Sequence, residues 1–272
     1  MLHLRCTFAT SFAMEVHRTT LVALLLLGAS YSAHATSSTT FWTPMTLDIQ
    51  PYGVPHLGID NYFTLSRSAP TGAFPTDITS PTIGLLPFTK VQAEVGVDYI
   101  ANTPHPWLFN FKIGTPENSL FKGQPAFEVG TFLLGRKTAT DRSDYDIVYA
   151  VVGKSLGPLG RVSIGPYVGN HKTLVSSAGT PQNSGYMVAY DHGFCHVKNG
   201  DFNRFVFAVD YASGKNFIGG GGGGLYIYFA KEVSLLVGPT FFNDRGINGG
   251  WKWSTQLDIN LPKIFGRRHR EQ

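Results

Sequence analysis

The feature that most constrains the fold is an alternation of apolar and polar residues with a period of two. The ranges Lys90–Tyr99, Arg204–Tyr211 and Trp251–Leu261 show it most clearly. In the last range, tryptophan, threonine, leucine and isoleucine alternate with lysine, serine, glutamine, aspartate and asparagine. Successive side chains of a β-strand point to opposite faces of the sheet. The alternation therefore predicts an all-β chain whose strands have one apolar and one polar face.

Followed along the chain, this alternation predicts about twelve strands, with ten as the other possibility. Their ranges are 56–66, 81–88, 91–101, 106–114, 124–135, 143–153, 160–170, 184–192, 202–212, 222–230, 233–242 and 250–260. Short connections such as Lys231-Glu232 alternate with connections that are mostly longer, at 67–80, 136–142, 171–183, 213–221 and 243–249. This asymmetry is typical of a transmembrane antiparallel β-barrel of the bacterial outer membrane. An even strand number places both termini on the short-turn, periplasmic side.

A soluble sandwich or a lipocalin-like barrel would alternate in the same way, because such folds bury their apolar face. Three observations favour the membrane barrel. The polar faces carry small residues and few charges, and the loops hold much of the remaining polarity. The apolar faces are aromatic near the strand ends, as in the girdles at membrane interfaces. The predicted girdle consists of Tyr99, Trp107, Tyr211, Phe229, Phe241, Trp251 and Trp253.

The two ends of the chain differ from the barrel region, 56–261. Arg18, the apolar run Leu21–Leu27 and the sequence Ser-Ala-His-Ala ending at Ala35 predict a signal peptide over residues 1–35, with Met14 as a possible true start. Residues 36–55 are rich in proline and aromatic residues, and either plug the lumen or lie along the periplasmic rim. Residues 262–272 form a basic tail.

The stretch Thr82–Tyr99 resembles the strand–turn–strand unit of Gram-negative outer-membrane barrels. It is particularly similar to a loose group of channels that includes the phenol-degradation-pathway outer-membrane proteins. The resemblance implies passage of small solutes, aromatic ones among them, and insertion by the barrel-assembly machinery among outer-membrane lipids. That machinery often reads an aromatic last residue, whereas here Phe265 is followed by the basic tail.

If the apolar faces meet lipid, the opposite faces point into the lumen. The predicted lumen-facing residues are Gln92, Glu94, Asp98, Asn110, Lys112, Glu128, Asp144, Asp146, Arg161, Ser163, Arg204, Asp210, Lys252, Gln256 and Asp258. Opposing charges of both signs would line a polar pore, and this passive channel is the leading hypothesis. The alternative is a non-conducting structural or surface-binding barrel whose lumen is filled by mutually paired charges.

Other motifs point only weakly to chemistry. The run Gly219–Gly224 lacks the Lys-Ser/Thr of a phosphate loop and leads into a strand. This run indicates a loop hinge or a strand start closely approached by another backbone. His192, Cys195 and His196 lack further ligands nearby, so no metal and no cofactor is predicted. The third hypothesis is a hydrolase with His192 as base and Asp191 or Asp210 as its orienting acid. It ranks below the two barrel functions above, so the sequence as a whole does not predict an enzyme. The net charge of +4 is too weak to signal a nucleic-acid surface, and no nucleic-acid partner is predicted.

Overall fold

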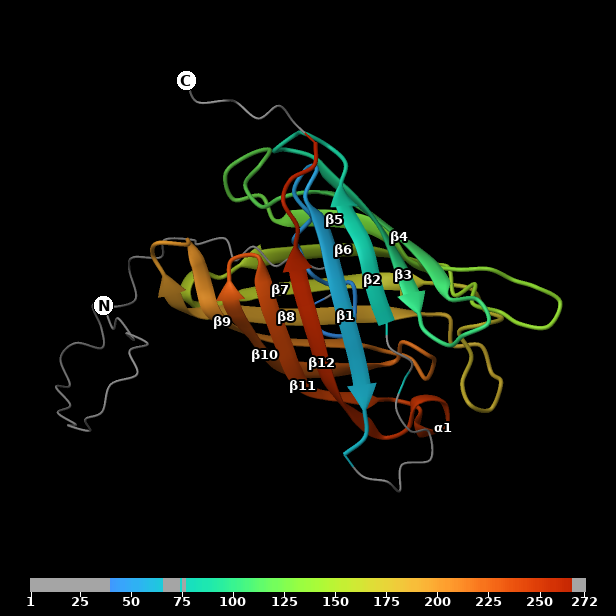
Figure 1. The fold of residues 1–272 in the computed structure, drawn as a ribbon. Coiled ribbons are helices and arrows are strands. Elements are labelled where there is room, and N and C mark those ends of the chain that lie inside the picture. The colour runs from blue at the N-terminus through green and yellow to red at the C-terminus, as the bar shows by residue number, and fades with distance from the viewer. Residues whose placement is uncertain (1–39, 66–73, 75–76, 266–272) are drawn as a thin grey trace.

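The computed structural model describes residues 40–65, 74 and 77–265, and within them twelve antiparallel strands form one closed barrel. This confirms the predicted all-β barrel of twelve strands (Figure 1). The strands are β1 (Pro55–Phe63), β2 (Asp77–Gly84), β3 (Gln92–Ile100), β4 (Trp107–Thr115), β5 (Ala126–Leu134), β6 (Ile147–Ser155), β7 (Arg161–Val168), β8 (Ser184–Val197), β9 (Phe202–Ala212), β10 (Gly220–Ala230), β11 (Val233–Phe242) and β12 (Trp251–Asn260).

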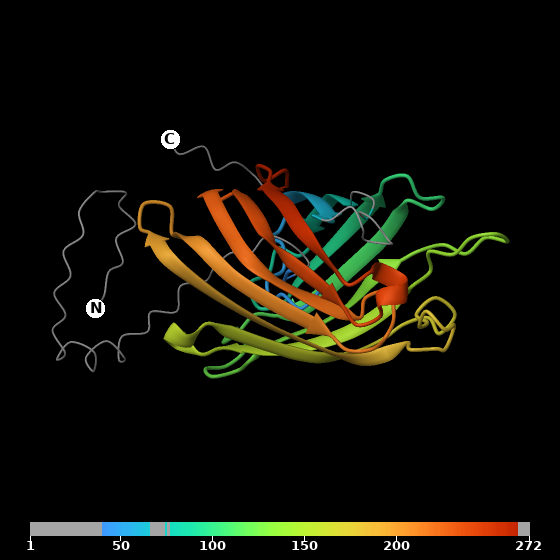
Figure 2. The ribbon, with the colours of Figure 1, turned by 90° about the horizontal axis from the view of Figure 1, so that it is seen from below.

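Each strand pairs with its neighbours in sequence, and β1 closes the barrel by pairing with β12 from His56 opposite Asn260 to Phe63 opposite Trp253. We call the two rims the turn end and the loop end. The turn end carries the connections 85–91, 116–125, 156–160, 198–201 and 231–232. The loop end carries 64–76, 101–106, 135–146, 169–183, 213–219 and 243–250, the last including the short helix α1 (Arg245–Asn248). Figure 2 shows the green and orange walls enclosing part of the blue N-terminal chain.

The alternation in sequence becomes an outer and an inner barrel surface. In β4, Trp107, Phe109 and Phe111 are exposed, whereas Asn110 and Lys112, which alternate with them, are buried inside. The outer surface is therefore apolar and the inner one carries both polar and apolar side chains, unlike a soluble barrel with a polar outer surface. Among the described residues, no helix is long and apolar enough to cross a membrane.

The structure differs from the sequence-based expectation at β6. The apolar side chains of Ile147, Tyr149 and Val151 are buried in the lumen, while Val148 is exposed outside. Here both faces of the strand are apolar, so the alternation of polarity does not identify the lipid face. Because β6 begins at Ile147 and not at 143 as predicted, Asp144 and Asp146 lie in the connection before β6 and not on a strand face.

Residues 40–50 run inside the barrel, and residues 51–54 lie at the turn end before the chain enters β1. We call residues 40–54 the lumen segment. Phe41, Thr43, Met45 and Gln50 are buried, although the segment forms neither helix nor strand. It starts beside the wall of β9 and β10 and reaches the turn end at Gln50, where its backbone contacts Glu94 of β3. The lumen segment therefore crosses the interior of the barrel.

Candidate functional site

The first attachment of the lumen segment is the carboxylate of Asp210 on β9. Its Oδ2 accepts hydrogen bonds from the backbone N–H groups of Phe41, Trp42 and Thr43 at 2.9, 2.8 and 2.7 Å. The hydroxyl of Thr43 donates a further bond to the same oxygen at 3.0 Å. Hydrogen bonds to an ionised acceptor are stronger than neutral ones. One inward carboxylate thus holds a turn of the segment that has no secondary structure of its own.

The ring of Phe41 occupies space that two glycines of β10 leave open. A Cβ added to Gly222 would lie 2.3 Å from Cδ1 of Phe41, and one added to Gly224 would lie 2.7 Å from its Cε2. Gly223 between them points to the outer surface, and a Cβ there would make ordinary contact with Val209 at 3.4 Å. The glycine-rich run therefore makes room for the ring of Phe41, where the sequence had predicted a hinge or the close approach of another backbone.

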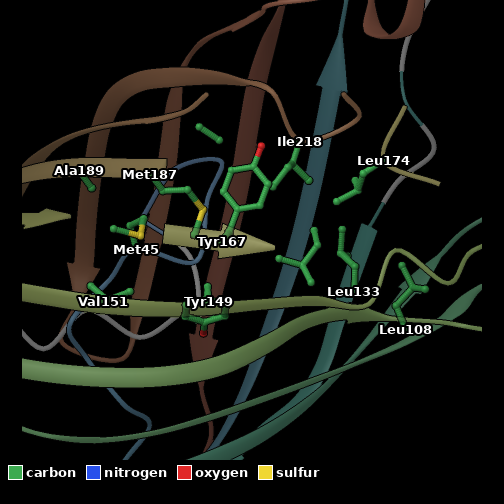
Figure 3. Packing of buried hydrophobic residues seen from close by; sticks show 12 residues of the cluster. Met45, Leu108, Leu133, Tyr149, Val151, Tyr167, Leu174, Met187, Ala189 and Ile218 are labelled. Carbon is green, nitrogen blue, oxygen red and sulfur yellow. The ribbon is translucent and has the colours of Figure 1, made fainter. Parts of the chain in front are cut away.

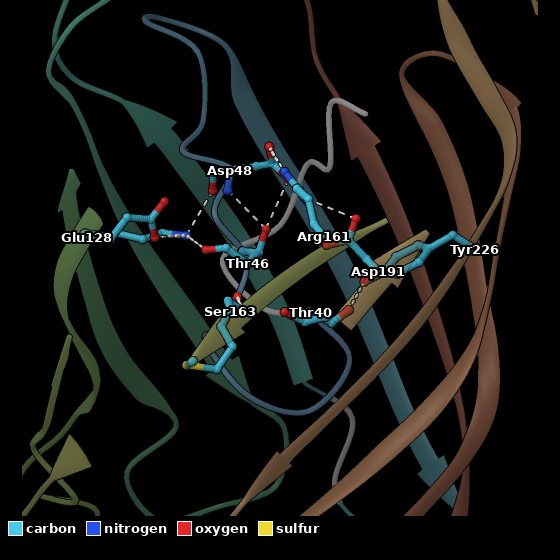
Figure 4. Close-up of polar contacts among 10 residues, drawn as sticks. Thr40, Thr46, Asp48, Glu128, Arg161, Ser163, Asp191 and Tyr226 are labelled. Carbon is cyan, nitrogen blue, oxygen red and sulfur yellow. Dashed lines mark hydrogen bonds and ion pairs between the residues drawn. The ribbon is translucent and has the colours of Figure 1, made fainter. Parts of the chain in front are cut away.

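A second attachment joins Asp48 to the guanidinium of Arg161 on β7. Arg161 donates Nη1 to Oδ1 of Asp48 at 2.9 Å and Nη2 to Oδ2 at 2.6 Å, while its Nε lies 3.0 Å from Asp191 on β8. Figure 4 shows Arg161 between these two acids. This bidentate geometry is the one that arginine and carboxylate favour. Sequence analysis did not single out Asp48, because it lies outside the alternating segments.

The third attachment uses the ammonium of Lys112 on β4. Nζ donates to the carbonyl oxygens of Thr46 at 3.3 Å and Asp48 at 2.9 Å. It also lies 3.5 Å from Glu128 and 3.8 Å from Glu94, and Lys112 is only 1% exposed. Glu94 in turn accepts the backbone N–H of Gln50 at 2.6 Å, in the same part of the lumen. The predicted lumen charges are thus used to bind a segment of the same chain.

The apolar side of the lumen is filled by side chains of β6, β7 and β8 together with Met45. Met45 packs in a cluster with Tyr149, Val151 and Met187, as Figure 3 shows. Ser163 of β7 donates a hydrogen bond to the carbonyl oxygen of Met45 at 2.7 Å. Met45 of the lumen segment thus packs on this apolar wall, whereas Phe41 packs on β10 and the backbone contacts charged residues.

Toward the loop end the lumen widens into a cavity of about 350 Å³. Aromatic residues line part of it, including Trp42 of the lumen segment, Tyr62 and Phe74. Four aspartates, Asp60, Asp77, Asp98 and Asp258, line it from neighbouring strands. Asp60 and Asp77 are missing from the sequence-based set. Asp60 could have been found by continuing the alternation through β1, but Asp77 precedes the predicted start of its strand.

The other residues of the predicted lumen set fall into three groups. Gln92, Asn110, Ser163, Lys252 and Gln256 alternate with outward residues on their strands, and the last four are buried. Arg204 donates Nη1 to the carbonyl oxygens of Tyr228 and Phe229 near the turn end. Asp144 is held by a bidentate contact with Arg142, and the hydrogen bond from that guanidinium lowers the pKa of Asp144.

The residues of the predicted girdle lie on the outer surface, mostly near the loop end. Tyr99 stands opposite Trp107, and Phe241 stands opposite Trp251, at the rim between their strand pairs. Trp107 and Phe241 are 54% and 55% exposed. The remaining residues are Tyr211 and Trp253 near the loop end and Phe229 near the turn end.

The residues considered for catalysis and for metal binding do not come together. Asp191 points into the lumen toward Arg161, whereas the ring of His192 stacks beside Phe194, which is exposed on the outer surface. Asp210 is occupied by the lumen segment. Within the described residues, no group of three or more His, Cys, Asp or Glu side chains is arranged to hold a metal ion.

Comparison with known proteins finds no matching family model and no matching curated protein. Among solved structures, a mutant porin from Rh. blastica matches at TM-score 0.37 and 10% identity, covering 82% of this chain and 66% of the porin. An outer membrane channel from Pseudomonas putida F1 matches at TM-score 0.41 and 10% identity, covering 78% and 96%. Outer membrane phospholipase A from Escherichia coli matches at TM-score 0.40 and 14% identity, covering 83% and 98%.

Proposed function

We propose that this protein is a β-barrel of the bacterial outer membrane that forms a channel for small solutes and is held closed by its own lumen segment. The observation that carries the proposal is the set of separate attachments between that segment and the wall. Asp210, Arg161 and Lys112 bind it at successive points across the interior. All of these contacts are polar and non-covalent, so the segment can be displaced without breaking the chain.

The outer surface supports the membrane location. Large apolar side chains such as Phe109, Ile164 and Phe207 are exposed at mid-strand positions. Exposed apolar surface costs about 25 cal/mol per Å² in water, and a lipid environment removes that cost. Closure of the barrel leaves no unpaired strand edge, as a membrane-spanning sheet requires. Periplasmic termini, a signal peptide, insertion by the barrel-assembly machinery and contact with outer-membrane lipid belong to the same proposal.

The test is planar-bilayer conductance of the refolded full chain and of one double variant. Gly222→Val fills the seat of Phe41, and Asp210→Asn weakens the attachment of residues 41–43. We expect the natural sequence to show little or no conductance and the double variant to conduct in reproducible steps. The matched control combines Gly223→Val, which points outward, with Asp201→Asn at the turn end. Equal conductance of the variant and this control would refute closure by the lumen segment.

A filled, non-conducting barrel is the second candidate, and the apolar cluster favours it. Ile147, Tyr149 and Met187 come from the wall itself, so they would occupy part of the lumen after the segment had left. Silence of the double variant, with its barrel shown to be folded by heat-modifiable migration in electrophoresis, would support this candidate. The protein would then act through its loops and the cavity at the loop end.

A further inference from the structure

The cavity at the loop end combines aromatic walls with an excess of carboxylates. Trp42 stacks on Phe74 with ring centroids 6.1 Å apart and meets Tyr62 edge-on at 5.3 Å. Tyr145 and Phe217 form a second stacked pair at 4.7 Å. All five rings line the same cavity, whose volume of about 350 Å³ lies in the range of small-molecule sites.

Two aspartates of this cavity face each other across neighbouring strands. Asp60 stands directly opposite Asp77 in the pairing of β1 with β2. Like charges opposite each other in a sheet are destabilising. The ion pairs of Lys112, Lys154 and Arg161 involve acids outside this cavity, and Arg142 on the cavity wall pairs with Asp144.

Two buried polar atoms on the cavity wall lack a hydrogen-bond partner among the described residues. They are Oδ1 of Asp77 and Nε2 of His56. His56 is only 1% exposed, and its Nε2 lies 3.4 Å from Asp258, a distance that forms an ion pair only when the ring is protonated. Buried polar groups are normally satisfied, so unsatisfied ones on a cavity wall indicate a missing partner.

We propose that this cavity binds an organic cation, namely an ammonium group carried on an apolar, ring-sized body. The carboxylates of Asp60 and Asp77 would neutralise the ammonium, and the aromatic rings would take the apolar body. Aromatic faces also attract cations directly, and Lys252 already places its ammonium 4.4 Å from the centroid of Phe74. The same carboxylates repel organic anions, and the cavity holds no ligand geometry for a metal ion among the described residues.

This inference names a ligand class for the proposed channel and rests on that proposed function only for how the ligand arrives. Binding itself requires neither a bilayer nor conductance. It is therefore measured by titration calorimetry on the refolded full chain in detergent at neutral pH. The probe is benzyltrimethylammonium, whose charge does not depend on pH, and the comparison ligands are neutral benzyl alcohol and anionic benzenesulfonate.

We expect saturable binding of benzyltrimethylammonium with one site per chain, at least tenfold tighter than that of benzyl alcohol, and no binding of benzenesulfonate. The double variant Asp60→Asn/Asp77→Asn keeps side-chain shape and is expected to weaken binding of the cation at least tenfold. Asp201→Asn, an exposed acid at the turn end, is the control and is expected to leave affinity unchanged.

Equal affinity for the cation and for benzyl alcohol would overturn the proposal without any variant. So would unchanged affinity in the double variant, or displacement of the probe by micromolar Ca²⁺, which would make the acids a metal site. Absence of probe binding would refute the cation site and would leave the separate conductance test of the closed channel unaffected. Probe binding by a barrel that never conducts would retain the site and reject the channel.

Discussion

At the scale of single residues, the inward charges of this barrel act on the chain itself. Asp210 is surrounded by three backbone donors of residues 41–43, which lie more than 160 positions away in the sequence. Arg161 bridges two acids, Asp48 and Asp191. A polar pore would present such groups to solute, whereas here they bind the backbone of an irregular segment that is not part of the sheet. Their first role is therefore to hold the lumen segment.

Replacement of Asp210 by asparagine tests this role directly. The variant keeps an acceptor oxygen but loses the charge, so we expect the free energy of local opening of residues 41–43 to fall by about 1–3 kcal/mol. Amide hydrogen exchange of Phe41–Thr43, followed by mass spectrometry in detergent, should accelerate correspondingly. Asp244→Asn at the loop end is the matched control. Unchanged protection of the three amides would show that Asp210 is not the attachment point.

At the scale of elements, the barrel wall and its connections are held by different forces. The wall is a continuous antiparallel ladder, whereas loops at the loop end meet through side chains. The carboxylate of Asp244 accepts hydrogen bonds from the backbone and hydroxyl of Ser177 and also caps α1 through Gly246. The hydrogen bond from the Ser177 backbone, followed by that from its hydroxyl, lowers the pKa of Asp244. This acid thereby ties the connection 169–183 to the connection 243–250.

The loop contact is expected to depend on pH. A carboxylate whose pKa is lowered in the folded state stabilises that state above its unfolded pKa, about 3.9, and loses this contribution as the pH falls through the lowered value. The amide resonance of Ser177, followed by NMR in detergent from neutral to strongly acidic pH, should therefore titrate below the ordinary aspartate range. Asp244→Asn should remove the titration. A titration that survives in this variant would assign it to another group.

At the scale of the whole molecule, the outer and inner surfaces define the medium around the barrel. Apolar residues are exposed around the wall, and aromatic pairs such as Phe241 with Trp251 stand at its rim. Charged residues are concentrated inside, where Lys112 and Glu128 are almost fully buried. In water this distribution would expose a large apolar surface, which soluble monomers avoid. In a bilayer the same distribution is the favourable one.

The variant Ile164→Arg distinguishes the two media. In a bilayer, an outward arginine near the middle of a strand lowers the free energy of unfolding by about 2–4 kcal/mol. A surface substitution in a soluble protein changes it by about 0.5 kcal/mol or less. For Ile164→Arg we expect the loss of about 2–4 kcal/mol in the free energy of unfolding, measured by denaturant titration in lipid vesicles. Ala178→Arg in the exposed connection 169–183 is the control and should behave like the natural sequence. Equal stability of the two variants would contradict a membrane barrel.

The amino-acid sequence by itself determined the strands and, for most of them, which face is apolar. Both follow from period-two alternation, which is a local property of each strand, and so does the number of strands. Where a strand is apolar on both faces, as in β6, the local pattern carries no such information, and only closure of the barrel decided that Ile147 and Tyr149 face inward.

Tertiary structure alone decided what the inward residues meet. Alternation places Asp210 and Gly222 on the inner face but does not indicate that Phe41 lies against both of them. The pairing of Asp60 with Asp77 likewise depends on the register between β1 and β2. Such contacts join residues far apart in sequence, and their geometry is set by the curvature and closure of the whole barrel. The occupied lumen and the acidic, aromatic cavity are consequences of that closure.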